Sequence, residues 1–250
     1  NNDSAYETAI SLYQKGINVE AIIDNREEID SKLIKETEKN NIKIYKGYTV
    51  VDTFGYKRIN KISIMHLSKD GQKVVGSKTH INCDCLGISG GWTPAVHLFT
   101  QSGGKLKFRD EDQVFIPNIY PSDQISIGSC NGEFTLDEIL STLPKTLKEF
   151  LNIKNTDYED LEIQSSFNKS KRNIWLLPSD KVIGKTKPFV DYQNDATAKD
   201  IKLALREGFR SIEHVKRYTT TGMGTDQGKL GNMHALGIIS ETAGSKMGEL

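Results

Sequence analysis

The chain has 250 residues, of which 36% are hydrophobic and 26% are charged, enough for one large or two small globular cores. Its 33 basic and 33 acidic residues cancel to a formal net charge of zero, which gives no support for a nucleic-acid-binding protein or a polybasic membrane-surface protein. No apolar run approaches the roughly 20 residues of a membrane helix, and no signal peptide opens the chain. We therefore expect a cytoplasmic protein.

A helix and a strand are predicted at the N-terminus. Apolar residues recur at helical spacing within residues 4–15, and Gly16 can end that helix. Residues 19–24 read VEAIID, which is typical of a short, buried parallel strand. Helix, strand and terminal acid in this order form half of a Rossmann unit. Because the chain starts at this helix without an initiator methionine, we expect an internal fragment of a longer protein.

The nucleotide-binding fingerprint of this unit is incomplete. In the usual form, G-x-G-x-x-G lets the helix N-terminus approach a pyrophosphate, and an acid at the end of the second strand bonds the ribose. Here Asn1, Asn2 and Asp3 occupy the turn, and Asp3 would repel a phosphate. Asp24 is placed to bond a ribose, but such an acid is often only a polar strand end. The sequence leaves open whether this unit binds a nucleotide.

An antiparallel meander is predicted next. A charged helix at 27–39 and a strand at 42–45 precede it, and Asp70-Gly71 is a hairpin turn signal. The predicted meander strands cover residues 48–54, 59–67 and 73–75.

Residues 80–98 follow the meander and read HINCDCLGISGGWTPAVHL. Their Asp84, Gly90 or Gly91, and Pro94 fit the segment that crosses from the second dinucleotide domain back to the first in two-dinucleotide-fold flavoprotein reductases, which this stretch resembles. Ile125 to Ile127 then predict a final strand, residues 128–132 a Gly-rich turn, and Thr135 a cap of the next helix.

The segment 189–231 predicts two helices with a polar loop at each end. Thr197 can cap a first helix that Gly208 ends, and Ser211 can cap a second helix that ends in the basic residue Arg217. The loops, DYQND and GMGTDQGKLG, resemble those of a [2Fe-2S] module fused to some amine-oxidising flavoproteins.

That module reads C-x-C-E-D-[VT] before its helices and G-x-G-x-C-Q-G-x-x-C after them. Its four thiolate positions fall here on Asp191, Gln193, Asp226 and Gly231. Since iron–sulfur clusters are held by thiolates, we expect no metal in this module. An ordinary helical hairpin with solvated loops is the alternative.

Two segments of this module without cysteines resemble the alpha subunit of heterotetrameric sarcosine oxidase in sequence. They read FVDYQNDATAKDI and EHVKRYTTTGMGTDQGK. The resemblance implies an α/β chain: part of a two-dinucleotide-binding-domain (FAD/NAD(P)-binding, Rossmann-like) flavoprotein fold, followed by a helical [2Fe-2S]-type module without cluster cysteines. The expected domains are a degenerate NAD(P)-type unit with the meander at 1–85, the return to the first dinucleotide-binding domain at 86–150, a connector at 151–184, and the vestigial module at 185–250.

The resemblance also implies cofactors and partners. NAD is expected in the first dinucleotide domain, at Gly128, Ser129, Gly132, Phe134, Thr135 and Leu136. FMN is expected between the alpha and beta subunits, facing the loop with Thr221 and Lys229, whose backbone N–H groups and ammonium suit an anion. FAD is expected on the beta subunit, where sarcosine is oxidised, and tetrahydrofolate in a domain outside this fragment. The partners are the beta, gamma and delta subunits.

Alternatives stay open at each of these places. The turn at 128–132 could pack without a ligand, and the loop at 219–229 could simply be solvated. The subunit could serve a related secondary-amine dehydrogenase, for proline or an opine, or act as a docking scaffold that binds no nucleotide.

No arrangement of residues predicts a catalytic group in this chain. The histidines are scattered and show no metal-binding spacing, and Ser89 in GISGG lies where the family needs only a strand end. Cys83 and Cys85 are expected as small hydrophobes on one face of a buried strand.

Overall fold

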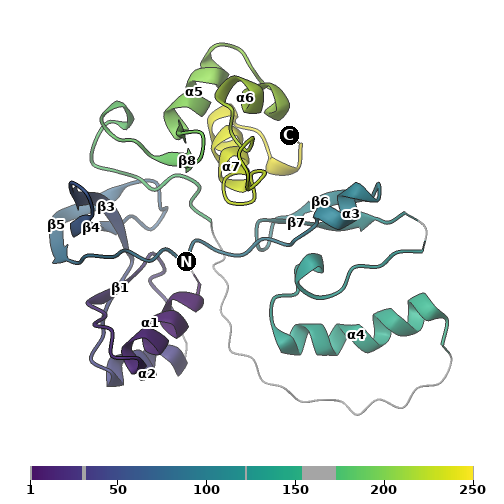
Figure 1. Cartoon of the computed structure of the whole chain (residues 1–250), viewed down its shortest axis with the longest axis horizontal. Helices are drawn as coiled ribbons and strands as arrows, with labels where there is room; N and C mark the ends of the chain where they lie inside the picture. Colours follow the sequence, from purple (N-terminus) through teal and green to yellow (C-terminus); the bar gives the residue numbers. More distant parts are fainter. Residues whose placement is uncertain (1, 30–31, 122, 154–172, 250) are drawn as a thin grey trace. The chain divides into compact units, whose positions relative to one another are not determined.

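The structure is a computed structural model that describes residues 2–29, 32–121, 123–153 and 173–249 (Figure 1). The chain divides into two compact units. The first comprises Asn1–Ile22, Arg26–Ile44 and Gly87–Asn173, and the second Ile23–Asn25, Tyr45–Leu86 and Ile174–Leu250. Much of the connector expected at 151–184 lies outside the described residues.

The N-terminal elements follow the predicted order. Helix α1 (Ser4–Gln14) leads to strand β1 (Ala21–Asp24), helix α2 (Lys32–Lys39) and strand β2 (Lys43–Lys46), and β1 and β2 form a two-stranded sheet. The structure confirms the predicted helix and strand. Their apolar side chains pack into one small core. Its buried residues are Tyr6, Ala9, Ile22, Ile34 and Ile42.

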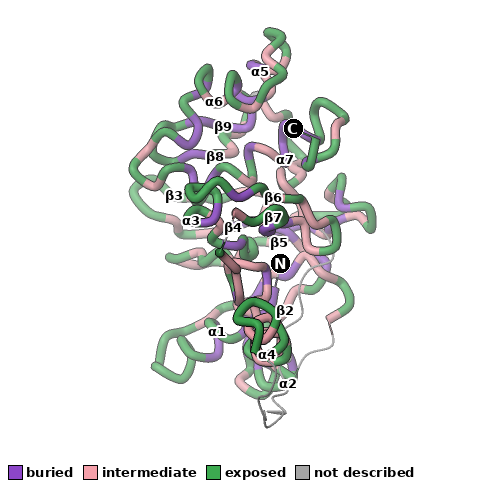
Figure 2. Tube along the Cα trace, turned by 90° about the vertical axis from the view of Figure 1, so that its right-hand side faces the viewer, coloured by how far each residue is buried: buried purple, intermediate pink, exposed green. Residues whose placement is uncertain are grey.

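The later part of the first unit holds a hairpin and a long helix. Helix α3 (His97–Gln101) is followed by the antiparallel strands β6 (Lys105–Arg109) and β7 (Val114–Ile119), the 3-10 turn η1 (Gly128–Asn131) and helix α4 (Leu136–Leu151). None of the residues of α4 is buried (Figure 2).

The prediction of a strand at 125–127 is wrong, because the structure has no strand at these residues. The backbone of Ile127 is extended, but no neighbouring strand pairs with it there, and a strand requires ladder hydrogen bonds.

The second unit contains the predicted meander. Strands β3 (Tyr48–Gly55), β4 (Ile59–Leu67) and β5 (Val74–Asn82) form one antiparallel sheet in that order. Strand β5 extends well beyond the expected residues 73–75. Cys83 and Cys85 lie past its end and are not buried, so their expected place within a buried strand is wrong.

Two ion pairs hold the segment before the C-terminal module to this sheet. The ammonium of Lys78 lies 2.7 Å from Asp180, and that of Lys181 lies 2.5 Å from Asp52. In the first pair the sheet supplies the basic residue and the segment the acidic one, and in the second pair these roles are reversed. The two pairs therefore specify which residues of the sheet and of the segment face each other. The segment is therefore anchored to the sheet at Asp180 and Lys181.

The C-terminal module is mainly helical. Strands β8 (Phe189–Asp191) and β9 (Ala196–Thr197) precede helices α5 (Ala198–Arg206), α6 (Ile212–Thr219) and α7 (Asn232–Ala243), and the short 3-10 turns η2 (Ile183–Lys185) and η3 (Met247–Glu249) flank them. The two helices predicted from sequence are α5 and α6, and Thr197 caps α5. The core residues are Val190, Ala198, Ile201, Ala204, Val215, Ala235, Ile238 and Ile239.

Helix α7 was not predicted, although it supplies much of this core. Its residues Ala235 to Ser240 are mostly buried, so it has no broad polar face (Figure 2). Gly237 lets the indole of Trp175 pack directly on the helix, since a Cβ there would lie 2.2 Å from ring carbons of Trp175. No described helix is long and apolar enough to cross a membrane.

Gly237→Ala tests this contact. Alanine favours a helix over glycine by about 1 kcal/mol, but the clash with Trp175 forces repacking. We expect a net loss of about 1–3 kcal/mol in the free energy of unfolding, measured by urea denaturation. Gly87→Ala is the control, because a Cβ at Gly87 meets no atom within 4 Å. Equal stability of both variants would contradict the packing role of Gly237.

Candidate functional site

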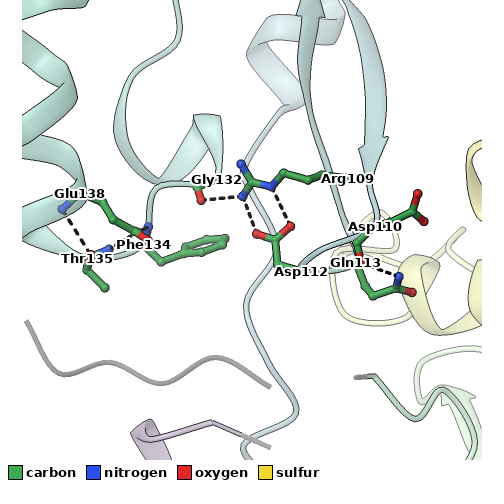
Figure 3. Close-up of polar contacts among 8 residues, drawn as sticks. All are labelled: Arg109, Asp110, Asp112, Gln113, Gly132, Phe134, Thr135 and Glu138. Atoms are coloured by element: carbon green, nitrogen blue, oxygen red, sulfur yellow. Dashed lines mark hydrogen bonds and ion pairs between the residues drawn. The ribbon is translucent and has the colours of Figure 1, made fainter. Parts of the chain in front are cut away.

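The turn before α4 brings the expected NAD-binding residues together. Thr135 forms a capping box: the Glu138 N–H donates to its hydroxyl (3.4 Å), and the Glu138 carboxylate accepts from the N–H groups of Phe134 (3.0 Å) and Thr135 (3.2 Å) (Figure 3). A second carboxylate, that of Glu133, accepts from the Gly128 N–H at 2.9 Å. Two glutamates therefore occupy backbone donors that a phosphate would use.

Arg109 of β6 holds the same turn from its other side. Its guanidinium donates to both carboxylate oxygens of Asp112, with Nε at 2.7 Å from Oδ1, and to the Gly132 carbonyl at 2.9 Å (Figure 3). The Asp112 hydrogen bond, opposed by burial, raises the pKa of Arg109. Gly132 has φ of 80°, and a Cβ there would lie 2.7 Å from Arg109 Nη2. The turn thus requires glycine at this position.

Side chains, more than backbone donors, remain accessible in this turn. Ser129 is exposed, Leu136 is 56% exposed and Phe134 is half-buried, whereas Thr135 is buried. Hydroxyl and apolar groups suit the sugar and ring parts of a dinucleotide better than its pyrophosphate. The sequence reasoning missed Glu138, although the Thr-x-x-Glu spacing of a capping box signals it.

The remaining expected site residues lie elsewhere. Asp24 ends β1 and is only 2% exposed. Thr221 and Lys229 belong to the loop between α6 and α7. Thr221 is 2% exposed and its hydroxyl lies 2.7 Å from that of Thr219, while Lys229 is exposed.

Asp191 joins the two loops of the C-terminal module. Its buried carboxylate accepts from the N–H groups of Gln193 (2.9 Å), Asn194 (3.0 Å) and, across the module, Gly222 (2.7 Å). Burial alone would raise the pKa of Asp191, but the hydrogen bonds from Gly222, Asn194 and Gln193 outweigh it and hold the pKa below its usual value. The Asp191 carboxylate thus links the loop that follows β8 to the loop that follows α6.

Gln193 and Asn194 add further bridges. The Gln193 side-chain carbonyl accepts from the N–H (2.5 Å) and the hydroxyl (2.8 Å) of Thr225, and the Asn194 amide donates to the Thr220 carbonyl at 3.1 Å. The loops of the module are therefore joined by side-chain hydrogen bonds at Asp191 and Gln193, two of the four positions expected to align with thiolates.

The other two positions also do not fit a [2Fe-2S] cluster. The Asp226 carboxylate accepts from the N–H groups of Gly228 and Leu230, each at 3.3 Å. At Gly231, a Cβ would lie 2.5 Å from the Val190 carbonyl oxygen, so a cysteine there would require the backbone to move. The chemistry of the donor set and the space at Gly231 both disfavour the cluster.

The loop after α6 differs from the expected cradle of backbone N–H groups. The N–H groups of Gly222, Thr225, Gly228 and Leu230 all point to side chains of the module itself. The Lys229 side chain of this loop is exposed.

A Ser–His contact occurs in the sheet, but it lacks the features of a nucleophile. The Ser63 hydroxyl lies 2.9 Å from His80 Nδ1, across the β4–β5 pairing. Ser63 is fully buried, and the neighbouring Asp52 binds Lys181. Because a substrate cannot reach a buried hydroxyl, Ser63 is not a candidate nucleophile. Among the described residues, no group of three His, Cys, Asp or Glu side chains is placed to hold a metal ion.

Comparison with known proteins identifies relatives. Residues 185–250 match the sarcosine oxidase A3 domain. The chain is 31% identical to sarcosine oxidase subunit alpha of Corynebacterium sp. strain P-1, over 97% of this chain and 25% of that protein. The subunit alpha of Rhizobium meliloti is also 31% identical, over 100% of this chain and 24% of its own length. The chain thus spans about a quarter of these relatives.

A solved structure shares the fold. L-proline dehydrogenase from P. horikoshii superposes with a TM-score of 0.52 and 19% identity, over 92% of this chain and 46% of the other. The similarity shows a mixed α/β fold common to both proteins.

Asp191→Asn tests the loop closure and its pH dependence. The pKa of Asp191 is lower in the folded than in the unfolded protein, so its stabilisation is present above the unfolded pKa of about 3.9 and is lost as pH falls through the folded value. We expect the variant to lose about 2 kcal/mol at pH 7 and less as the pH falls below about 4, measured by denaturant unfolding.

Asp195→Asn is the control, because Asp195 is exposed in the same loop. Equal losses from both substitutions, or a loss from Asp191→Asn that grows at low pH, would contradict the role of the carboxylate.

Metal analysis tests the cluster positions. We expect iron and acid-labile sulfide well below one equivalent per chain after expression with iron supplied, because Asp226 and Gly231 offer no thiolate. Stoichiometric iron and sulfide would overturn this assignment.

Proposed function

Because the chain is homologous to sarcosine oxidase alpha subunits along its whole length, we propose that it is the segment of such a subunit that binds NAD and contributes to the FMN-containing interface. The complete enzyme would oxidatively demethylate sarcosine with O2, giving glycine, H2O2 and 5,10-methylenetetrahydrofolate. This segment would act as an oxidoreductase component and would be inactive alone. We also propose that the chain folds as part of a two-dinucleotide-domain flavoprotein with a vestigial [2Fe-2S] module.

The observation that supports NAD binding is the turn at 128–136. It places an exposed hydroxyl, Ser129, and an exposed apolar side chain, Leu136, at the N-terminus of the long helix α4. We propose that Ser129 bonds a ribose and that Phe134 and Leu136 pack against a ring. Gly128, Gly132 and Thr135 set the backbone of the turn. NAD, when bound, supplies a nicotinamide ring that exchanges hydride.

The proposed FMN contact rests on the loop after α6. Lys229 brings an exposed ammonium to a loop in which several backbone donors bind side chains of the module itself, and Thr221 supports that loop from inside. We propose that this loop faces FMN or the beta subunit. The gamma and delta subunits, FAD on beta and tetrahydrofolate elsewhere in alpha complete the assembly.

One rival function has an observation in its favour. Glu133 and Glu138 occupy the N–H groups of Gly128, Phe134 and Thr135, which agrees with a docking scaffold that binds no nucleotide. A proline or opine dehydrogenase subunit is the other alternative.

Ser129→Trp tests the NAD proposal. An indole at this exposed position would block the turn without entering the core, and we expect the affinity for NAD to fall more than about tenfold, measured by calorimetry on the full alpha subunit. Gly132→Trp is a weaker test, since any Cβ there meets Arg109 and Ile116.

Ser141→Trp is the matched control, because Ser141 is exposed on α4 outside the turn. Unchanged NAD binding by Ser129→Trp would show that the nucleotide lies elsewhere, and the absence of NAD binding by the parent subunit would favour the scaffold.

A further inference from the structure

We infer that the turn before α1 excludes nucleotides, because Asp3 and Arg26 fill with an internal ion pair the place that a phosphate takes in a Rossmann unit. The inference concerns the N-terminal unit and does not depend on NAD binding at residues 128–136. It makes Asp3 a residue that determines where in this chain a nucleotide can bind.

The ion pair is buried at the start of the helix. Asp3 directly precedes α1 and is 0% exposed, and its Oδ1 lies 2.9 Å from Arg26 Nη1. The Arg26 side chain is 11% exposed. A carboxylate at this position takes advantage of the positive end of the helix dipole, as a bound phosphate would. An incoming phosphate would meet a buried negative charge whose cation is already paired.

Backbone donors at the helix start are also used. The Ser4 N–H donates to the Asn2 side-chain oxygen at 3.0 Å, and the Tyr6 N–H donates to the Asp3 carbonyl at 3.0 Å. In a Rossmann unit such N–H groups bind the pyrophosphate. Here the chain satisfies the N–H groups of Ser4 and Tyr6 with its own oxygen atoms.

Ser89, from the segment between β5 and α3, closes the same turn. Its hydroxyl donates to the Asn2 side-chain oxygen at 2.9 Å and lies 2.7 Å from the Ser4 hydroxyl. Asn2 is 4% exposed. A dinucleotide would have to displace this hydrogen-bonded group as well as the ion pair.

Asp24 also does not have the ribose-binding role expected of it. An acid at the strand end bonds the ribose in NAD-binding units, and a nearby arginine accommodates the 2′-phosphate of NADP. Asp24 is 2% exposed, and Arg26 follows it by two positions but is bound to Asp3. The ribose contact expected at Asp24 is therefore replaced by a closed, nucleotide-free turn.

Chemical rescue of Asp3→Asn tests the inference in the 250-residue chain. The substitution removes the carboxylate that the largely buried Arg26 guanidinium contacts at 2.9 Å, and we expect the Tm to fall by about 10 °C in phosphate-free buffer. Inorganic phosphate should recover at least half of that loss, and acetate at equal ionic strength should recover less. No recovery, or equal recovery with acetate, would overturn the proposal that Asp3 stands in for a phosphate.

Two variants control for other causes. Arg26→Gln removes the cation, so we expect it to be destabilised and not rescued by phosphate. Glu7→Gln removes an exposed acid from the same helix and should change neither the Tm nor its response to phosphate. Rescue of Arg26→Gln by phosphate would contradict the role of the cation.

Hydrogen exchange on the unmodified chain keeps the inference testable if Asp3→Asn does not fold. Saturating NAD should leave the exchange of amides 2–26 unchanged, and protection there would overturn the inference. Protection at 128–139 would support the proposed NAD site. Its absence would count against that function alone, so the two failures are distinguishable.

Discussion

Carboxylate oxygens that accept hydrogen bonds from backbone N–H groups hold several loops of this protein in place. Glu138 binds two N–H groups at the start of α4, Asp191 binds three in the C-terminal module, and Asp200 binds the Thr197 N–H at 2.8 Å. Such charge-assisted hydrogen bonds are roughly twice as strong as neutral ones. Each loop therefore has a defined shape without a bound ion or cofactor.

This arrangement changes what the loops can bind. Where a dinucleotide fold offers N–H groups to a phosphate, this chain satisfies backbone donors with Glu133 and Glu138 and pairs Asp3 with the Arg26 side chain. In the C-terminal module the same chemistry bridges the loops that four thiolates and iron would join. The groups that remain exposed in the turn before α4 and in the loop after α6 include the side chains of Ser129 and Lys229.

Local signals predicted much of the fold. Thr135 and Thr197 were expected as caps, since a cap and its partner lie within four residues of each other. The meander followed from its alternation and from the turn at Asp70-Gly71. The β6–β7 hairpin also carries such a signal, the alternation KLKFR at 105–109, which our prediction lacks. Helix α7 has no comparable signal, because it is buried on most sides.

The amino-acid sequence was sufficient to show the similarity to sarcosine oxidase alpha subunits and the lack of cysteines at the four aligned positions, because both depend on residue identity. It also predicted the order of most helices and strands, because these depend on neighbours in the chain. The tertiary structure alone decided which side chains join the two loops of the C-terminal module. Asp191 meets Gly222 across 31 positions, and Asp3 meets Arg26 across 23. Pairings over such separations arise from packing of distant segments, and neither spacing nor periodicity encodes them locally.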